Sequence, residues 1–277
     1  MGLTTGVCFA HLGHDVICED IDVDKVARLD RGESPIVEER IEELIAEGLE
    51  TGRLRFTDSP AAAVSDCEIA FLCVPTPSLP DGSVDLAFIE SAVEMIADAL
   101  PPGAVVATKS TVPVGSTRVV EQTLGRHDVA VVSNPEFLRE GTAVQDFLAP
   151  DRVVIGSDDP EASARVAALY EPLGAPVVIT DPATAETVKY VANAFLATKL
   201  SFVNAIAAVC EAVGADVDDV MASLGHDHRI GPDYLQPGPG WGGSCFPKDT
   251  RALLQISEEA GYPFRFLEGV LEVNAQQ

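Results

Sequence analysis

Short runs of β-branched and apolar residues alternate along the chain with longer segments in which apolar residues recur at helical spacing. The short runs lie at residues 16–18, 69–74, 105–107, 129–132, 152–155 and 177–179, and a strongly periodic helical segment, 86–99, separates two of them. Strands that alternate with helices pair as parallel neighbours, because each helical crossover returns the chain to the same end of the sheet. The first part of the chain is therefore expected to be an α/β domain with a parallel sheet.

From residue 182 the pattern changes to helix after helix. The first helix is expected to run without interruption to about residue 213, where Gly214 would end it. Thr180, Asp181 and Pro182 are typical of a turn followed by a helix start. We therefore place the boundary near residue 180, with an α/β domain over residues 1–180 and an all-α domain over 181–277. At roughly 150 residues per domain, a length of 277 residues fits two domains.

The charge balance excludes several classes of partner. The chain has 18 Lys and Arg against 44 Asp and Glu, a formal net charge of −26, which repels nucleic acid and anionic membrane surfaces. We expect no nucleic-acid partner, no membrane span and no targeting segment, and hence a cytoplasmic protein. Only five of the basic residues are lysines. An acidic, lysine-poor surface indicates a halophilic protein from a high-salt cytoplasm.

The six cysteines form no CxxC pair and no Cys/His cluster with metal-ligand spacing, so we expect reduced thiols and neither a zinc site nor a disulfide framework. His226 and His228 flank Asp227, but their side chains alternate and no fourth ligand is evident. No metal site is predicted. Five of the cysteines lie in apolar periodic runs and are expected to be structural: Cys8, Cys18, Cys67, Cys73 and Cys210.

The beginning of the chain resembles half of a dinucleotide-binding βαβ unit. Residues 2–12 are expected to form a helix with Gly13 just past its end, followed by a strand that finishes at Glu19-Asp20. Gly2 and Asp20 have the spacing of the third glycine of GxGxxG and the acid that binds the ribose. Lys25 would neutralise a phosphate, although a solvated strand-end acid and an exposed helix lysine remain the simpler interpretations. The first strand and the two earlier glycines are not in this sequence.

Cys245 differs from the other cysteines in its surroundings. The glycine-rich residues 237–243 form a turn that delivers Cys245 directly before a predicted helix. The backbone amides at a helix N-terminus and the nearby Lys248 both favour the thiolate, which is the nucleophilic form. Cys245 is therefore the candidate nucleophile.

Five motifs occur together in the chain: KSTVPVGST at 109–117, NPEFLREGTA at 134–143, KYVANAFLATK at 189–199, GGSCFPKDT at 242–250 and the Thr76-Pro77 pair. Their order along the chain is that of the UDP-glucose/GDP-mannose dehydrogenase family, which the sequence resembles. The UDP-glucose branch of that family fits best. The resemblance implies a Rossmann-like NAD-binding domain, a central helical dimerisation domain, and a C-terminal UDP-binding domain that this chain lacks. It also implies a homodimer paired through the long central helix.

The implied reaction is a four-electron, NAD-dependent oxidation of the C6 alcohol of UDP-glucose to UDP-glucuronate, through a thiohemiacetal and a thioester on Cys245. Residues at the family's catalytic positions are Cys245, Lys189, Asn193, Asp249, Glu136 and Thr111. Those at cofactor positions are Gly2, Asp20, Lys25, Thr76, Pro77, Thr111, Glu140 and Lys248. Those at sugar positions are Glu136, Phe137, Leu138, Lys189, Asn193, Arg229, Tyr234, Leu235 and Gly242, with Arg229 reaching the partner's substrate.

Several alternatives stay open on sequence alone. GDP-mannose or a UDP-N-acetylhexosamine could be the substrate, and the chain could be a non-catalytic dimerisation fragment. Residues 34–40 follow the family's PIYEPG loop only in part, which puts cofactor contacts there in doubt. Without the resemblance, Glu136 and Glu140 would be interpreted as solvated helix charges, and Lys189 as a surface lysine.

Overall fold

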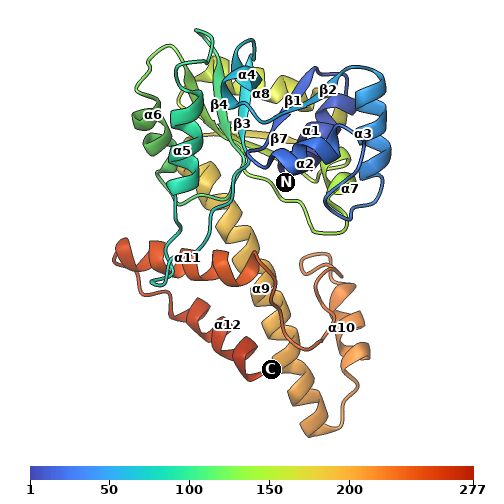
Figure 1. Ribbon diagram of the computed structural model, residues 1–277. Coiled ribbons are helices and arrows are strands. Elements are labelled where there is room, and N and C mark those ends of the chain that lie inside the picture. Colours follow the sequence, from blue (N-terminus) through green and yellow to red (C-terminus); the bar gives the residue numbers. More distant parts are fainter. The chain divides into compact units, whose positions relative to one another are not determined.

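The computed structural model describes all 277 residues, which divide into two compact units (Figure 1). The first unit comprises Met1–Thr76 and Leu86–Thr187, and the second comprises Pro77–Asp85 and Val188–Gln277. The segment Pro77–Asp85 forms a small hairpin closed by a bridge between Ser78 and Val84. Val84 is buried among helices of the second unit, which explains why this excursion belongs there.

The first unit contains a five-stranded sheet and a separate two-stranded sheet. The larger sheet has the order β3 (Ile69–Leu72), β4 (Val105–Thr108), β5 (Ala130–Ser133), β6 (Val153–Gly156) and β7 (Val177–Thr180). The smaller one pairs β1 (Val16–Glu19) with β2 (Leu54–Thr57). These strands confirm the α/β class, and the predicted strands are found within a few residues of the expected positions. The strand β2, Leu-Arg-Phe-Thr, was not predicted.

The parallel prediction is correct for every pair except one. β5 and β6 are antiparallel and meet only at Ser133 and Gly156. The chain between them contains an irregular segment and the six-residue α7 (Ala143–Leu148) instead of a long crossover helix. The antiparallel contact is thus confined to one residue pair, whereas β6 and β7 pair in parallel over four residues.

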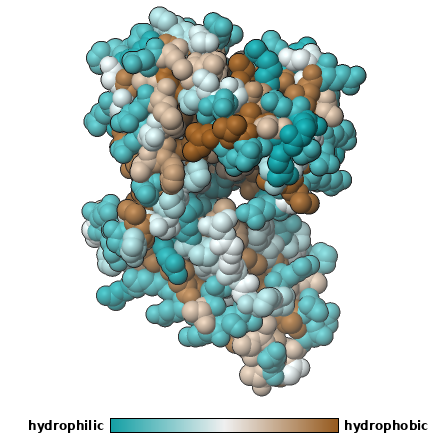
Figure 2. Space-filling model, viewed as in Figure 1, coloured by the Kyte–Doolittle hydropathy of each residue, from teal (hydrophilic) through white to brown (hydrophobic).

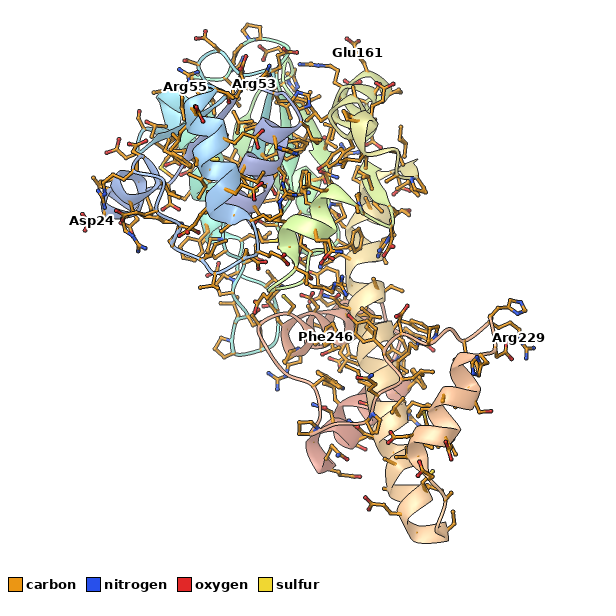
Figure 3. The ribbon with its side chains drawn as sticks, turned by 90° about the vertical axis from the view of Figure 1, so that its right-hand side faces the viewer. Asp24, Arg53, Arg55, Glu161, Arg229 and Phe246 are labelled. Atoms are coloured by element: carbon orange, nitrogen blue, oxygen red, sulfur yellow. The ribbon has the colours of Figure 1, made fainter.

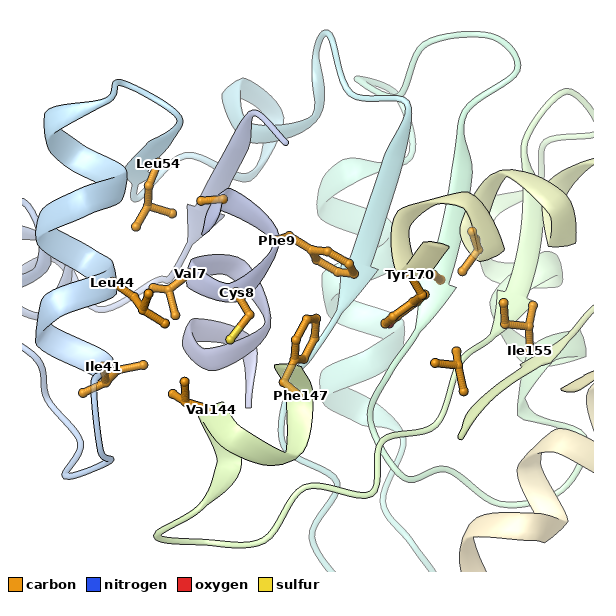
Figure 4. Packing of buried hydrophobic residues seen from close by; sticks show 14 of the residues in the cluster. Val7, Cys8, Phe9, Ile41, Leu44, Leu54, Val144, Phe147, Ile155 and Tyr170 are labelled. Carbon is orange, nitrogen blue, oxygen red and sulfur yellow. The ribbon is translucent and has the colours of Figure 1, made fainter. Parts of the chain in front are cut away.

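The helices of the first unit cover the sheets and pack into two apolar clusters, to which alternate residues of β4 contribute: Val105 and Ala107 to one and Val106 to the other. They are α1 (Gly2–His11), α2 (Val23–Leu29), α3 (Ile41–Glu50), α4 (Pro60–Val64), α5 (Ala87–Ile96), α6 (Ser116–Leu124), α7 and α8 (Pro160–Tyr170), followed by the 3-10 turn η1 (Glu171–Leu173). In the core, the Phe9 ring lies 5.1 Å from Phe147 at 90° and 5.2 Å from Tyr170 (Figure 4). Such edge-to-face contacts add to the free energy gained by burying the rings.

Glycine allows α1 to lie close to β1. A Cβ on Gly6 would be 2.2 Å from Cys18 Sγ, so no other residue fits at this position without a shift. β1 and β3 are not hydrogen-bonded to each other, and most of their side chains are half-buried. Figure 2 accordingly shows apolar side chains gathered beside β3 on a face that is otherwise mostly hydrophilic.

The second unit is helical, as predicted. It contains most of α9 (Pro182–Val213), then α10 (Val217–Gly225), α11 (Phe246–Glu259) and α12 (Arg265–Gln276). The predicted uninterrupted helix is confirmed, and Gly214 ends it with φ +75°. Tyr190, Ala197 and Leu267 are almost completely buried in the core of this unit.

The division between the units falls inside α9, between Thr187 and Val188, and not at the turn near residue 180. The first turn of α9 packs on β6, because a Cβ on Gly156 would be only 2.5 Å from Ala185 Cβ. These contacts attach the start of the helix to the first unit.

The expectation that no apolar stretch is long enough to span a membrane is wrong. By length and composition, α9 passes as a candidate span, with 28% of its most apolar 18-residue window buried. Lys189 and Lys199 interrupt the apolar run, which hides this candidate span in the sequence pattern. The core helices of globular proteins meet the same criterion, so this helix is weak evidence for a membrane.

Candidate active site

A buried polar cluster joins α9 and α11 in the second unit. Asp249 is 1% exposed; its Oδ2 accepts a hydrogen bond from Asn193 Nδ2 (2.5 Å), and its Oδ1 accepts one from Lys248 Nζ (2.7 Å). A carboxylate removed from water is stable only when it is paired and hydrogen-bonded in this way. The cluster brings together three predicted site residues that lie on two different helices.

Cys245 is the residue immediately before α11, one turn from Asp249. The backbone N–H of Asp249 donates to the carbonyl of Cys245 (2.8 Å), and the Cys245 side chain is exposed. Its Sγ lies 3.5 Å from Ser244 Oγ. The predicted geometry, with the thiol at the helix N-terminus and Asp249 one turn later, is therefore present.

Four of the other five cysteines have surroundings that suppress the thiolate. Burial raises the pKa of Cys8 to about 12 and that of Cys18 to about 12, and it also raises the pKa values of Cys67 and Cys73. Cys210 is buried on α9. Since the thiolate is the reactive form, the exposed Cys245 is the thiol best placed for chemistry.

Lys189 is not a surface lysine. It is 4% exposed and lies one helical turn before Asn193 on α9, so both side chains project from the same face of that helix. A buried ammonium beside an amide donor suits the stabilisation of negative charge on a substrate oxygen.

Glu136 and Glu140 lie on the irregular segment after β5, so interpreting them as helix charges is wrong. Glu136 is only 6% exposed, and its Oε2 accepts a hydrogen bond from the Leu138 backbone N–H (2.5 Å). Glu140 is exposed. The Phe137 ring stacks 3.7 Å from the Arg152 guanidinium, which restrains this segment.

Thr111 lies on the loop after β4 and is half-buried. Thr76 is half-buried at the end of its stretch of the first unit, and the exposed Pro77 begins the hairpin of the second. The carbonyl of Pro77 accepts a hydrogen bond from the Asp85 backbone N–H (2.8 Å). The predicted groups thus fall into two sets, one in each unit.

Lys109 and Asn134 belong to two of the motifs, but the sequence did not reveal their roles. They take part in a buried chain of hydrogen bonds next to the loop that carries Thr111. Lys109 Nζ donates to the Tyr170 hydroxyl (3.2 Å), which donates to Asn134 Oδ1 (2.5 Å). Asn134 Nδ2 in turn donates to the Val154 carbonyl (2.9 Å). These hydrogen bonds connect the carboxyl ends of β4 and β5 to β6 and α8. They therefore support the segments that carry Thr111 and Glu136.

Glu186, near the beginning of α9, was also missed. Its buried carboxylate accepts hydrogen bonds from the backbone N–H groups of Gly115 (2.6 Å) and Thr117 (2.8 Å) and from Thr117 Oγ1 (2.7 Å). It thereby caps α6, where unpaired N–H groups attract negative charge. Burial raises the pKa of Glu186, and these three hydrogen bonds oppose the rise. The only sequence signal is an acid within an apolar helical pattern.

The start of α1 fits a dinucleotide. A Cβ on Gly2 would lie 3.2 Å from Cys73 Cβ, so the helix approaches the residue after β3 as the third glycine of the motif requires. Asp20 follows β1, forms an ion pair with Lys25 and accepts a hydrogen bond from the Asp22 backbone N–H (3.1 Å). Both charged side chains therefore lie at the strand end where the motif places the ribose-binding acid.

The residues predicted to bind the sugar are differently placed. Arg229 is exposed on the loop after α10, where Asp227 pairs with it (Figure 3). Tyr234 has φ +60°, Leu235 is buried against Val203 and Met221, and Gly242 is exposed. The structure contains no cluster of three or more residues able to hold a metal ion.

Comparison with known proteins gives consistent matches over the chain. Residues 1–174 match the NAD-binding domain of the UDP-glucose/GDP-mannose dehydrogenase family, and residues 183–276 match its central domain. The UDP-glucose 6-dehydrogenase of Rhizobium meliloti (strain 1021) is 47% identical over 284 residues, covering 99% of this chain and 65% of that protein. UDP-glucose 6-dehydrogenase TuaD of Bacillus subtilis (strain 168) is 45% identical, covering 100% of this chain and 61% of that protein.

Among solved structures, a UDP-glucose dehydrogenase from the hyperthermophilic archaeon Pyrobaculum islandicum superposes with a TM-score of 0.95 at 40% identity. The match covers 99% of this chain and 66% of that one. The chain therefore spans less than two thirds of the length of the curated relatives named above.

Replacing Glu186 with Gln tests the cap on α6. An amide presents one acceptor oxygen where the carboxylate presents two, so at least one N–H of the α6 start loses its partner. We expect the free energy of unfolding at neutral pH to fall by about 1–3 kcal/mol, measured by urea denaturation. Glu161→Gln, at an exposed position in the first turn of α8, is the matched control and should change stability little (Figure 3). Equal stability of the two variants would contradict the cap.

Proposed function

Because the chain belongs to the UDP-glucose/GDP-mannose dehydrogenase family, we propose that it provides the NAD-binding and catalytic units of a UDP-glucose 6-dehydrogenase. The reaction converts the C6 alcohol of UDP-glucose into the carboxylate of UDP-glucuronate. One observation carries the proposal: an exposed thiol at the start of α11 lies one turn from a buried Asn-Asp-Lys cluster.

The chemistry needs a thiol because an aldehyde carbon gives up its hydride readily only after a nucleophile has added to it. NAD, when bound, accepts the two electrons released in each of the two oxidation steps. After the first oxidation, Cys245 Sγ adds to C6 of the aldehyde and gives a thiohemiacetal. The second oxidation converts this to a thioester, and water then releases the carboxylate and regenerates the free thiol.

The buried cluster supplies the charge control that these steps require. Lys189 and Asn193 stabilise negative charge on the C6 oxygen, since an ammonium and an amide are both hydrogen-bond donors. Asp249 moves the proton of the C6 oxygen or orients the hydrolytic water. Glu136 and Thr111, in the first unit, position that water and the cofactor.

We propose that the residues that bind the cofactor lie in the first unit and at the N-terminal end of α11. Gly2 lets the beginning of α1 pack closely against the sheet, Asp20 binds the ribose, and Lys25 lies beside it. The remaining cofactor residues are Thr76, Pro77, Thr111, Glu140 and Lys248. The residues that line the sugar are Glu136, Phe137, Leu138, Lys189, Asn193, Tyr234, Leu235 and Gly242.

We also propose a homodimer formed through α9. Val191, Phe195, Phe202, Val209 and Val213 are 50–71% exposed and follow one another at steps of four and seven residues, which places them on one helix face. A stripe of this kind costs free energy in water. Pairing with a second copy would cover it and would let Arg229 reach the partner's substrate.

The cellular setting is part of the same proposal. A net charge of −26 with five lysines suits a halophilic protein in a high-salt cytoplasm, where acidic side chains keep the surface hydrated. No membrane or nucleic-acid partner is needed for the proposed reaction.

Cys245→Ser tests the covalent step. Wild-type protein should release two molecules of NADH for each carboxylate formed, because the oxidation removes four electrons in pairs. Cys245→Ser should form UDP-glucuronate at least about a thousandfold more slowly, since serine is a far weaker nucleophile at neutral pH. NADH absorbance and mass spectrometry of the sugar nucleotide measure both quantities. The control Cys67→Ser, at a partly buried thiol of the first unit, should retain the wild-type rate. Wild-type rates in Cys245→Ser would refute the covalent step.

Phe195→Glu combined with Phe202→Glu tests the dimer. Each substitution buries a carboxylate in an apolar contact, so the dissociation constant of the dimer should rise at least about a hundredfold. Sedimentation equilibrium measures the change. Phe88→Glu, at an exposed phenylalanine of α5, is the control and should remain dimeric. A double variant that dimerises like the wild type would show that another surface forms the interface.

A further inference from the structure

The glycine-rich loop at residues 237–244, which precedes Cys245, has one buried residue, Trp241. Its neighbours Pro239 and Gly242–Cys245 are exposed, whereas Trp241 is 9% exposed in the core of the second unit. The indole Nε1–H donates to Ser201 Oγ on α9 (2.8 Å), and Ser201 Oγ–H donates to the Val270 carbonyl on α12 (2.9 Å). Trp241 therefore anchors an otherwise exposed loop.

Asn274, on α12, holds the main chain of the same residue. The Trp241 backbone N–H donates to Asn274 Oδ1 (2.7 Å), and Asn274 Nδ2 donates to the Trp241 carbonyl (2.9 Å). One side-chain amide thus satisfies both backbone groups of Trp241, as a neighbouring strand would. The approach is close enough that a Cβ on Gly240, which has φ +97°, would lie 3.0 Å from Asn274 Oδ1.

A second amide fixes the beginning of the loop. Asn204, on α9 and 4% exposed, accepts a hydrogen bond from the Gly238 backbone N–H (2.8 Å). Gln277 donates to the carbonyl of Gly238 (2.8 Å). The loop is therefore attached by polar side chains of α9 and of the chain's last helical segment, far from it in sequence.

Trp241 also contacts the other end of the loop. Its ring packs edge-to-face against Phe246, at 6.2 Å and 85°, and Phe246 is the first residue of α11 (Figure 3). Cys245 adjoins Phe246. Whatever orients Trp241 therefore restrains the residues on both sides of the thiol.

We propose that Asn274 and Ser201 are positioning residues for Cys245, acting through Trp241. This inference deepens the proposed function, because it explains how an exposed thiol on a glycine-rich loop keeps one position relative to the buried cluster of Asn193 and Asp249. Neither residue touches the reacting atoms. Their effect is to restrict the loop to one conformation, so that the thiol meets C6 in the geometry the addition requires.

Trp241 is the only tryptophan in the chain, so its fluorescence reports directly on this loop. In Asn274→Ala the backbone of Trp241 loses both hydrogen bonds. We expect the fluorescence emission of Trp241 to shift to the red. The efficiency of acrylamide quenching and the rate of Cys245 alkylation by iodoacetamide should each change about fivefold. Peptide mass spectrometry follows the alkylation. Gln276→Ala, at an exposed position two residues further along α12, is the matched control and should behave like the wild type.

A purely structural role predicts a different result. It would lower the urea midpoint of Asn274→Ala while leaving the emission, quenching and alkylation of the folded protein at wild-type values, and that outcome would overturn the proposal. These readings need no turnover, so they stand even if the chain does not oxidise UDP-glucose. If turnover is present, kcat should fall more than KM rises.

Ser201→Ala keeps the test decisive if Asn274→Ala does not fold. Ser201→Ala should change the Cys245 alkylation rate in the Trp241 protein, but much less in a Trp241→Phe background, where no indole N–H needs a partner. Equal effects of Ser201→Ala in the two backgrounds would show that the indole hydrogen bond does not position the thiol.

Discussion

A single buried carboxylate organises the second unit. Asp249 is almost completely removed from water, and its carboxylate accepts hydrogen bonds from the Asn193 amide and the Lys248 ammonium. Removing one partner from a buried pair of this kind costs about 3–5 kcal/mol. This requirement holds the beginning of α11 against α9, and Cys245 is the residue immediately before α11. The position of the nucleophile is therefore a consequence of satisfying one buried charge.

In the first unit, too, carboxylates hold connecting segments in place by accepting hydrogen bonds from the backbone. Glu186 caps α6, and Glu38 accepts hydrogen bonds from the backbone N–H groups of Gly141 (2.7 Å) and Ala143 (3.0 Å) at the start of α7. Both carboxylates fasten loops that adjoin proposed site residues. While most acids of this chain face solvent, a few hold the connections between elements, and the functional segments lie on those connections.

The sequence predicted the elements well, because short apolar runs and a long periodic helix are local signals. The packing of the elements and the pairing of the strands were harder to predict from the sequence. The single antiparallel contact between β5 and β6 has no signal in the sequence pattern. The strand β2, Leu-Arg-Phe-Thr, is too polar to stand out. Arg40 occupies the last position of the loop that only partly follows PIYEPG, and it adopts φ +65°, a conformation that favours glycine.

Site residues were predicted where a motif marked them and missed where the role is structural. Asn193 and Asp249 are hydrogen-bonded and Cys245 lies one helical turn before Asp249, whereas Lys109, Asn134, Glu186 and Asn274 act through contacts between distant parts of the chain. No local pattern reveals such pairings.

The most direct test of the account is selective labelling of Cys245. Intact protein mass is measured after mild iodoacetamide treatment, with and without NAD and UDP-glucose, for the wild type and for Cys245→Ser. We expect the wild type to gain one alkyl group rapidly. This addition should be absent in Cys245→Ser and should be blocked by NAD and UDP-glucose. Labelling that is spread over other cysteines, or that the ligands leave unchanged, would contradict an assembled site at Cys245.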